Sequence, residues 1–323
     1  MKSPADIACL VTGVAGFVGS HLAERLVSLG YHVVGVDNLF SGRLENISNL
    51  LRNSFFSFHE ISIEERGLLN WLKRLYPSLS VCFHLAAIVS VPYSLEHPEQ
   101  CFKINYEATA SLLEEANRLA LDTFIFAGSA AEYGKESRQP LREEYASEAT
   151  IHLSPYGKAK YLASHLVSKS SHLPRGVALR CFNIYGPRQD PSSPYSGVIS
   201  RFLEMARDRI PLTIYGDGYQ SRDFIYVADV VEAYLVAAGL LPGYKVPPAG
   251  VYNVGTGIST TILDLAKLIV ELTGTFESFT FCPERPGDIR HSVADIAFFK
   301  NSTGWRPLVR LRDGIRKTLD SGE

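Results

Sequence analysis

A glycine-rich segment near the start of the chain places the strongest constraint on the fold. Three glycines, spaced three residues apart, stand in TGVAGFVG, residues 12–19. The segment follows a β-branched, apolar run at 7–12 and leads into residues whose apolar members recur at helical spacing. A strand, a tight glycine turn and a helix in this order are typical of a dinucleotide-binding unit, in which the helix N-terminus faces a pyrophosphate. We therefore predict such a unit here.

The same alternation of short strands and helices continues through the first half of the chain. Expected strands lie at 7–12, 32–37, 55–60, 81–85, 123–127 and 177–181, and expected helices include 104–120 and 156–170. Strands that are apolar on both faces require cover on both sides, which predicts a parallel sheet between two helical layers. We assign the chain to the α/β class, with a doubly wound parallel sheet of the Rossmann type and a smaller C-terminal substrate-binding domain.

The pattern becomes less regular after about residue 180. A Pro- and Ser-rich loop at 186–197 is followed by helices at 198–208, 227–241 and 261–272 and by strands at 212–215 and 251–254. Long loops in compact domains are usually functional. We expect residues 1–180 to bind the cofactor and residues 181–323 to form mainly the substrate domain, with segments at about 213–255 packing back onto the first domain.

Composition excludes several classes of function. The 32 basic and 34 acidic residues nearly balance, and no Lys/Arg block is present, which argues against binding to nucleic acid or to an anionic membrane. No apolar run reaches the ~18 residues that a membrane span needs, and the first residues lack a signal peptide, so we expect a cytoplasmic protein. The 5 cysteines form no C-x-x-C pair and the 9 histidines no H-x-x-x-H, so no metal site is expected.

An acidic residue at the end of the second expected strand bears on the choice of cofactor. Asp37 closes the run at 32–37. A carboxylate there accepts hydrogen bonds from ribose hydroxyls and repels a 2′-phosphate, which favours NAD over NADP. Arg43 argues for NADP, because a nearby arginine can hold such a phosphate. The alternative interpretation is that Arg43 is a solvated loop charge or contacts the pyrophosphate. We expect NAD.

A tyrosine and a lysine four residues apart form a second chemical signal. Tyr156 and Lys160 lie on one face of the helix expected at 156–170. A phenol has an ordinary pKa near ~10, so it acts as a base at neutral pH only with help from a cation such as Lys160 and from an oxidised nicotinamide. Ser129 follows the strand at 123–127, so its hydroxyl is expected at the carboxyl edge of the sheet, facing the same crevice.

Taken together, the motifs resemble a known family. They are TGVAGFVGSH, VDNLFSGR, HLAA, the serine before AAEYG, SPYGKAK, LRCFNIYGPRQ, QSRDFIYVADV, NVGTG and ERPGD. In this order, from about residue 6 to residue 310, they resemble the extended short-chain dehydrogenase/reductase superfamily and, within it, the NAD-dependent nucleotide-sugar 4-epimerases. The resemblance implies that Ser129, Tyr156 and Lys160 are catalytic. It also implies that a phenolate removes the proton of the sugar C4 hydroxyl while hydride moves to NAD, and that hydride then returns to the opposite face.

The resemblance further implies which positions hold the two ligands. Those expected at NAD, besides Tyr156 and Lys160, are Gly13, Gly16, Phe17, Val18, Gly19, Asp37, Asn38, Ser41, Gly42, Arg43, Glu60, Ile61, Leu85, Ala86 and Ala87. Those expected at a UDP-sugar are Ser90, Ser129, Asn183, Val198, Tyr215, Arg222, Arg285, Asp288 and Ser292. Asn105 would support the active-site network. Arginines suit this ligand because a diphosphate offers oxygens that they can bind in a bidentate way.

Two differences from the motifs of related enzymes limit the reactions that we expect of this chain. Dehydratases of this family carry an Asp-Glu pair directly after the catalytic hydroxyl, where this chain has Ala130 and Ala131. Decarboxylases usually carry Glu at the position of Ala131, whereas here an acid stands one residue later, at Glu132, to which the sequence assigns no role. We expect a UDP-sugar 4-epimerase; a nucleotide-sugar dehydratase or reductase and a non-enzymatic, cofactor-binding regulator are the competing hypotheses.

The sugar itself is less constrained by the sequence. In the epimerases that the chain resembles, the residue seven positions after the arginine equivalent to Arg285 lines the sugar pocket; here it is Ser292, which leaves room for an N-acetyl group. The expected substrates are therefore UDP-glucose/galactose, UDP-GlcNAc/GalNAc or both. UDP-glucuronate is the alternative, because Arg188 or His291 could meet its carboxylate. The resemblance also implies a homodimer packed through the helices expected at 104–120 and 156–170.

Overall fold

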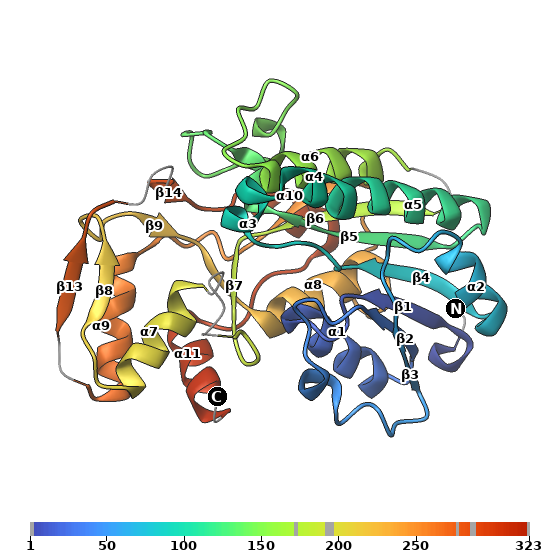
Figure 1. The fold of residues 1–323 in the computed structure, drawn as a ribbon, viewed down its shortest axis with the longest axis horizontal. Coiled ribbons are helices and arrows are strands. Elements are labelled where there is room, and N and C mark those ends of the chain that lie inside the picture. The colour runs from blue at the N-terminus through green and yellow to red at the C-terminus, as the bar shows by residue number, and fades with distance from the viewer. Residues whose placement is uncertain (1–2, 171–173, 191–196, 276–277, 285–288, 322–323) are drawn as a thin grey trace.

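A seven-stranded parallel sheet forms the centre of the fold in the computed structural model, which describes residues 3–170, 174–190, 197–275, 278–284 and 289–321. Among these residues its strand order is β11-β6-β5-β4-β1-β2-β3 (Figure 1). The bounds are β1 (Ala8–Thr12), β2 (His32–Asp37), β3 (Phe56–Glu60), β4 (Leu79–His84), β5 (Thr123–Ser129), β6 (Arg175–Cys181) and β11 (Gly250–Val254). Because β1 pairs with both β2 and β4, the strand order reverses there, and such a switch point opens a crevice for ligands. The predicted fold class is confirmed.

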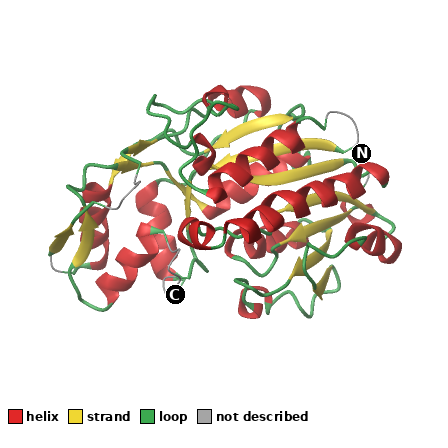
Figure 2. Cartoon of the chain, turned by 45° about the horizontal axis from the view of Figure 1, so that its top comes forward, coloured by secondary structure: helices red, strands yellow, loops and turns green. Residues whose placement is uncertain are grey.

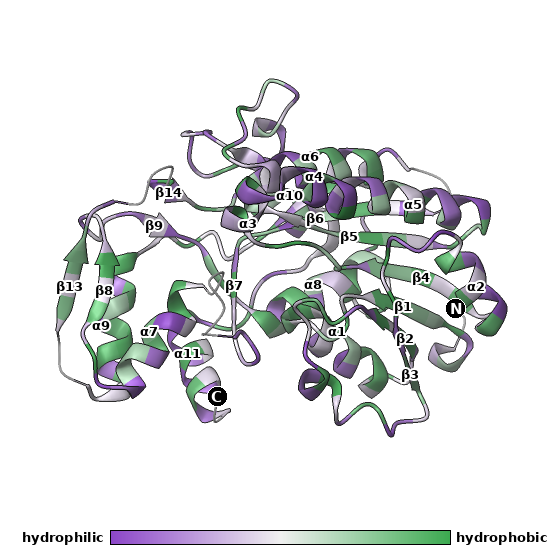
Figure 3. Ribbon diagram, in the orientation of Figure 1, coloured by the Kyte–Doolittle hydropathy of each residue, from purple (hydrophilic) through white to green (hydrophobic). Residues whose placement is uncertain are grey.

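Helices cover both faces of this sheet (Figure 2). Apolar side chains of α1 (Phe17–Ser28) and α8 (Val227–Ala238) pack on one face. Those of α2 (Leu68–Leu75), α5 (Thr109–Arg118) and α6 (Pro155–Ser168) pack on the other. The central strands β1, β4 and β5 are largely green in Figure 3, as expected for a sheet that is buried on both sides.

A smaller part of the molecule lies beside the carboxyl ends of the central strands. It contains the parallel pairs β7 (Asn183–Tyr185) with β10 (Phe224–Tyr226) and β8 (Leu212–Tyr215) with β13 (Phe279–Cys282). It also contains β9 (Ser221–Arg222), β12 (Thr260–Thr261), β14 (His291–Ser292), α7 (Val198–Arg207), α9 (Ile262–Thr273) and α11 (Leu311–Asp320). Apolar residues of α7, β8, α9 and α11 share one core cluster.

The chain returns to the central sheet after entering this smaller part. β11 pairs with β6 from Gly250 opposite Val177 to Val254 opposite Cys181. α10 (Ala297–Thr303) then packs on β11, with the Phe299 and Tyr252 ring centroids 5.4 Å apart. The division into two domains at about residue 180 stays a prediction.

The expected single helix over 104–120 is wrong in its first part. Residues Lys103–Ala108 form a π-helical turn that runs into α5, and two short helices, α3 (Val91–Glu96) and α4 (Pro98–Phe102), precede it. The buried Asn105 side chain lies in the π turn, accepting from the Ile88 backbone N–H and donating to the Ile88 carbonyl, both at 2.8 Å. Wider turns of this kind often occur at functional sites.

Short 3₁₀ turns complete the described secondary structure. They span Pro4–Asp6, Leu44–Ile47, Ala130–Tyr133 and Glu143–Tyr145. In the described ranges, no helix combines the length and the apolar character that crossing a membrane requires. Those ranges likewise bring no three His, Cys, Asp or Glu side chains into an arrangement that could hold a metal ion.

Candidate active site

A cavity of about 710 Å³ lies between the central sheet and the smaller part of the molecule. Most of the positions predicted from the sequence line it. From the expected cofactor set these are Gly13, Gly16, Phe17, Val18, Gly19, Asp37, Asn38, Ser41, Gly42, Arg43, Ile61, Leu85, Ala86, Ala87 and Tyr156. From the expected substrate set they are Ser129, Asn183, Arg222 and Ser292.

Several predicted positions do not reach the cavity wall. Glu60 is exposed at the end of β3, and Ser90 is buried, with its hydroxyl accepting the Tyr93 N–H at 2.8 Å to cap α3. Lys160, Val198 and Tyr215 lie outside the lining as well. Arg285 and Asp288 lie outside the described residues. The ligand roles of all these positions stay predictions.

The glycine turn after β1 is built by close backbone contacts. Gly13 has a φ of +70°, and a Cβ there would stand 2.8 Å from the Ala86 nitrogen. A Cβ on Gly19 would stand only 2.1 Å from the Gly13 carbonyl oxygen. A side chain at Gly19 would therefore push α1 away from the turn, and one at Gly13 would push the turn away from the segment that follows β4. The backbone N–H groups at the start of α1 consequently border the cavity, an arrangement that suits a pyrophosphate.

Asp37 joins this turn to the end of β2. Its carboxylate accepts the Ala15 N–H at 3.0 Å and the Leu39 N–H at 2.8 Å. Burial raises the pKa of Asp37, and these two hydrogen bonds oppose that rise. The carboxylate borders the cavity at the position from which an acceptor can meet ribose hydroxyls.

A short segment after β7, residues 187–190, crosses toward α1 beside the cavity, and we name it the strap. The Pro187 carbonyl lies 3.0 Å from His21 Nε2, and an Arg188 guanidinium nitrogen donates to Glu24 Oε1 at 2.6 Å. Asp190 forms an ion pair with Arg43. Arg43 therefore faces a carboxylate, which offsets the positive charge that would favour a 2′-phosphate.

The three candidate catalytic residues come from β5 and α6. Ser129 ends β5, and Tyr156 and Lys160 lie one turn apart near the start of α6, which Ser154 caps by accepting the Gly157 N–H at 3.1 Å. The Lys160 ammonium lies 6.0 Å from the Tyr156 ring centroid and donates to the Ala127 carbonyl at 2.8 Å. The structure thus brings the predicted hydroxyl, phenol and cation together.

Burial dominates the acid–base properties of this group. It raises the pKa of Tyr156 to about 12, although a hydrogen bond with Ser129 acts in the opposite direction. Burial also lowers the pKa of Lys160 to about 8, and the negative charge of Glu132 opposes that change. Burial thus disfavours the charged form of Lys160, which lies beside a phenol that does not ionise by itself at neutral pH.

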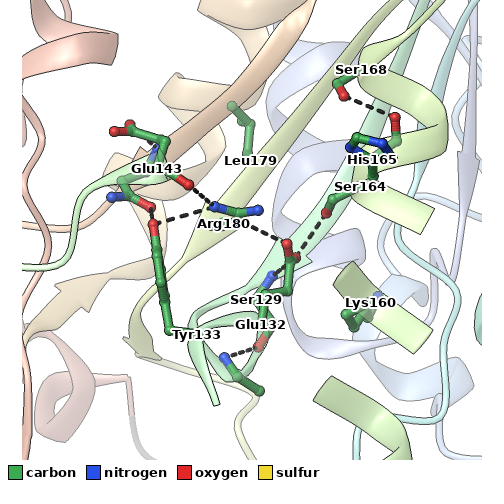
Figure 4. A network of polar contacts seen from close by, with 12 residues as sticks. Ser129, Glu132, Tyr133, Glu143, Lys160, Ser164, His165, Ser168, Leu179 and Arg180 are labelled. Atoms are coloured by element: carbon green, nitrogen blue, oxygen red, sulfur yellow. Dashed lines mark hydrogen bonds and ion pairs between the residues drawn. The ribbon is translucent and has the colours of Figure 1, made fainter. Parts of the chain in front are cut away.

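The sequence assigned no role to Glu132, whose side chain is fully buried and lies next to Ser129 in Figure 4. Ser129 caps the 3₁₀ turn Ala130–Tyr133, and Glu132 reaches back to the Ser129 N–H, which completes a capping box. The S-x-x-E spacing of Ser129 and Glu132 is the sequence signal that could have identified this contact.

Other cavity residues carried no sequence signal. They enter from loops, strands, 3₁₀ and π-helical turns and the short helices α3 and α4: Phe40, Asn46, Ser62, Ile63, Glu64, Ile88, Val89, Val91, Gln100, Ile104, Gly128, Cys181, Phe182, Ile184, Gln189 and Ile289. Most of them are apolar, and an apolar residue near a strand end is ordinarily assigned to the core.

Comparison with known proteins decides the family. Residues 9–255 match the model of the NAD dependent epimerase/dehydratase family, which is more than half of the chain. The chain belongs to this family. The predicted superfamily, an NAD-dependent enzyme of the isomerase type and NAD as its cofactor are thereby confirmed.

Individual relatives align with nearly the whole chain. A UDP-glucose 4-epimerase of Mycolicibacterium smegmatis is 34% identical over 96% of this chain and 97% of its own. A UDP-glucose 4-epimerase of Thermotoga maritima, solved with UDP-glucose, superposes with a TM-score of 0.87 at 36% identity, covering 97% of this chain and 98% of that one. A UDP-glucuronic acid 4-epimerase of Bacillus cereus, solved with UDP-glucuronic acid and NAD, has a TM-score of 0.84 at 33% identity over 97% and 98% of the two chains.

Proposed function

We propose that this chain epimerises C4 of a neutral hexose carried by UDP, as UDP-glucose/galactose or UDP-GlcNAc/GalNAc. One observation carries the proposal: Ser129 and Tyr156 meet at the cavity wall with the Lys160 ammonium 6.0 Å from the phenol ring. Beside them Ala130 and Ala131 line the same wall with methyl groups only. These methyl groups supply no acid or base for the elimination of water, which leaves oxidation and reduction at one carbon, with proton transfer at its hydroxyl, as the chemistry available.

The proton transfers fall to Tyr156 and Ser129. Tyr156 would hold the proton exchanged with the sugar C4 hydroxyl at its phenol oxygen, and Ser129 would orient that hydroxyl. Lys160 would stabilise the phenolate electrostatically, since a cation close to a phenol favours its ionised form. NAD, held by the glycine turn and Asp37, would supply the hydride acceptor and a positive ring near the phenol when bound.

The substrate's diphosphate needs positive charge within a nearly neutral protein. Arg222 on β9 and the amide of Asn183 on β7 border the cavity from the smaller part of the molecule. A guanidinium can bind phosphate oxygens in a bidentate way, so Arg222 would hold the diphosphate. Arg285 and Asp288 are expected to add contacts there.

The charges around the cavity favour a neutral sugar over a glucuronate. Arg188, one candidate for a carboxylate partner, donates to Glu24 Oε1 at 2.6 Å. His291, the other, is exposed, lies outside the cavity lining and has its Nδ1 2.9 Å from Ser221 Oγ. A glucuronate carboxylate would therefore have to compete for Arg188 with a carboxylate of the protein. The small side chain of Ser292 at the wall is compatible with an N-acetyl group.

A homodimer is the second part of the proposal. The π-helical turn, α4, α5 and α6 pack beside one another on one side of the sheet (Figure 1). These are the segments through which we expect two copies to associate. Sedimentation velocity should give the mass of two chains, and a single species at 35.7 kDa would contradict this part.

The function is tested by incubating the protein with UDP-glucose, UDP-GlcNAc and UDP-glucuronate and identifying products by NMR. We expect C4 epimers of the first two and little or no conversion of the glucuronate. Tyr156→Phe should lower kcat by about 10²–10⁴, the usual contribution of general acid–base catalysis. Accumulation of a 4-keto product would instead favour a dehydratase, and no conversion of any sugar would refute the enzyme.

A further inference from the structure

A buried ion pair lies directly beneath the candidate catalytic residues. The Arg180 Nε atom on β6 is 2.5 Å from Glu132 Oε2, and the two side chains are 3% and 0% exposed. Every other ion pair between described residues has at least one partner that is 20% or more exposed. Burying two charges is costly and adds little net stability, so stability alone gives a weak reason for this pair.

The second oxygen of the carboxylate connects the elements that carry the catalytic residues. Glu132 Oε1 accepts the Ser129 N–H at the end of β5 and the Ser164 hydroxyl on α6, both at 2.8 Å (Figure 4). Ser164 follows Tyr156 by eight residues and Lys160 by four, so the three share one face of α6. One carboxylate therefore contacts β5, α6 and β6 at the level of the site.

Glycine at position 128 makes room for this contact. A Cβ there would lie 2.8 Å from Glu132 Oε1 and 3.0 Å from the Leu179 carbonyl oxygen. The Glu132 carboxylate thus packs against the β5 backbone at Gly128, next to Ser129, whose N–H it accepts.

Arg180 is itself fixed on its far side. One guanidinium nitrogen donates to the Glu143 carbonyl at 2.8 Å and lies 3.5 Å from the Tyr133 hydroxyl. That hydroxyl donates to the Asn253 side chain on β11 at 2.6 Å. The network therefore reaches from the catalytic serine to the edge strand of the sheet.

We propose that Glu132, held by Arg180, is a positioning residue that fixes Ser129 against Tyr156 during the reaction. The inference rests on the proposed function. Glu132 itself does not line the cavity, and it acts through the Ser129 backbone and through α6.

Hydrogen-bond chemistry explains why a carboxylate is required. The Ser129 N–H and the Arg180 Nε–H both donate, one to each oxygen of Glu132. A glutamine would have to present its NH₂ group to one of these donors. In either orientation it would therefore release Ser129 or leave a buried cation unpaired, which is the costly outcome.

The charge of Glu132 also acts on the phenol. The groups that face Tyr156 from the surrounding elements are Ser129, Lys160, Glu132, Cys101, Cys181 and Tyr234. Among them the carboxylate of Glu132 raises the pKa of Tyr156. Removing its charge should lower that pKa and shift the acid limb of the kcat/KM profile toward lower pH.

The first test is Glu132→Gln in the NAD-loaded enzyme with UDP-glucose. We expect kcat to fall at least tenfold while KM stays within twofold, because Asn183 and Arg222 are untouched. We also expect the acid limb to move to lower pH. Unchanged kcat and an unchanged pH profile in a folded variant would overturn the proposal.

A double variant separates positioning from the loss of a charge. Glu132→Gln combined with Arg180→Gln lets the new amides bond to each other while the Ser129 N–H keeps its acceptor. If Glu132 acts by positioning Ser129, kcat of the double variant should recover to within threefold of the wild type. A folded double variant as slow as Glu132→Gln alone would overturn it.

Glu115→Gln is the matched control, because Glu115 is also buried and accepts the Gly67 and Leu69 N–H groups at 2.8 and 2.9 Å, at the start of α2. It should lower stability and leave kcat and the pH profile unchanged; a fall in kcat equal to that of Glu132→Gln would overturn the proposal.

Hydrogen exchange does not depend on enzyme activity, so it can distinguish a failure of this inference from a failure of the proposed function. Hydrogen exchange of the peptide that contains the Ser129 amide should be slow in the wild type, faster in Glu132→Gln and slow again in the double variant. An inactive wild type with this pattern would refute the epimerase while retaining the role of Glu132. Equal exchange in all three proteins would refute that role.

Discussion

The buried ammonium of Lys160 should reduce the stability of the protein at neutral pH. Burial lowers its pKa from the ordinary 10.5 to about 8, and at ~1.4 kcal/mol per pH unit this difference corresponds to about 3 kcal/mol. Between pH 8 and 10.5 the unfolded chain binds more protons at this site than the folded chain. The free energy of unfolding should therefore rise with pH across that window.

Lys160→Met removes this cost and one hydrogen bond. The Ala127 carbonyl loses the donor that now lies 2.8 Å away, a loss of about 1–2 kcal/mol. At pH 7 the variant should be more stable than the wild type by about 1–2 kcal/mol. By pH 10.5 the wild type carries a neutral amine that keeps its hydrogen bond, so the order should reverse.

The assay is urea unfolding followed by circular dichroism at several pH values, on protein freed of nucleotide. Lys158→Met, an exposed position of the same helix, is the matched control and should show no such reversal. A Lys160→Met protein that is less stable than the wild type at pH 7, or a stability difference that does not change with pH, would refute the reasoning.

Two further predictions concern the cofactor. Gly19→Ala places a Cβ 2.1 Å from the Gly13 carbonyl oxygen, so NAD affinity should fall at least tenfold in a fluorescence titration with NADH; affinity equal to that of the wild type would contradict the close packing of the turn. Asp190→Asn removes the carboxylate that faces Arg43. Calorimetric titrations should then give a ratio of NADP to NAD affinity several times higher than in the wild type, and an unchanged ratio would show that the ion pair does not govern this choice.

The sequence predicted the central sheet well because its strands are continuous apolar runs between clear breaks. The strand at 32–37 was expected with the bounds that β2 has, since Gly30 precedes it and Asp37 closes it. The helix over 104–120 was less predictable. Its apolar spacing fits an α-helix throughout, and the π turn depends on Ile88, a backbone partner 17 residues away from Asn105.

The candidate site also contains some features that the sequence predicts and others that it does not. The glycine turn and the Tyr156/Lys160 spacing are local patterns, and so the sequence could predict them. The partner of Glu132 is 48 residues away, in a strand where Arg180 interrupts an apolar run. Only the pairing of β5 with β6 brings them together, with Gly128 opposite Arg180. Neither residue alone indicates an ion pair.

The position of β11 limits how the specificity of this fold can be changed. All five residues of β11 are paired with β6, although β11 lies between two halves of the smaller part in the chain, β7 to β10 before it and β12 to α11 after it. A fragment that ends after β6 would expose an unpaired strand edge, which invites aggregation. The smaller part is thus not a module that can be exchanged independently of the central sheet. A redesign for a new sugar has to proceed by side-chain substitutions at the cavity wall.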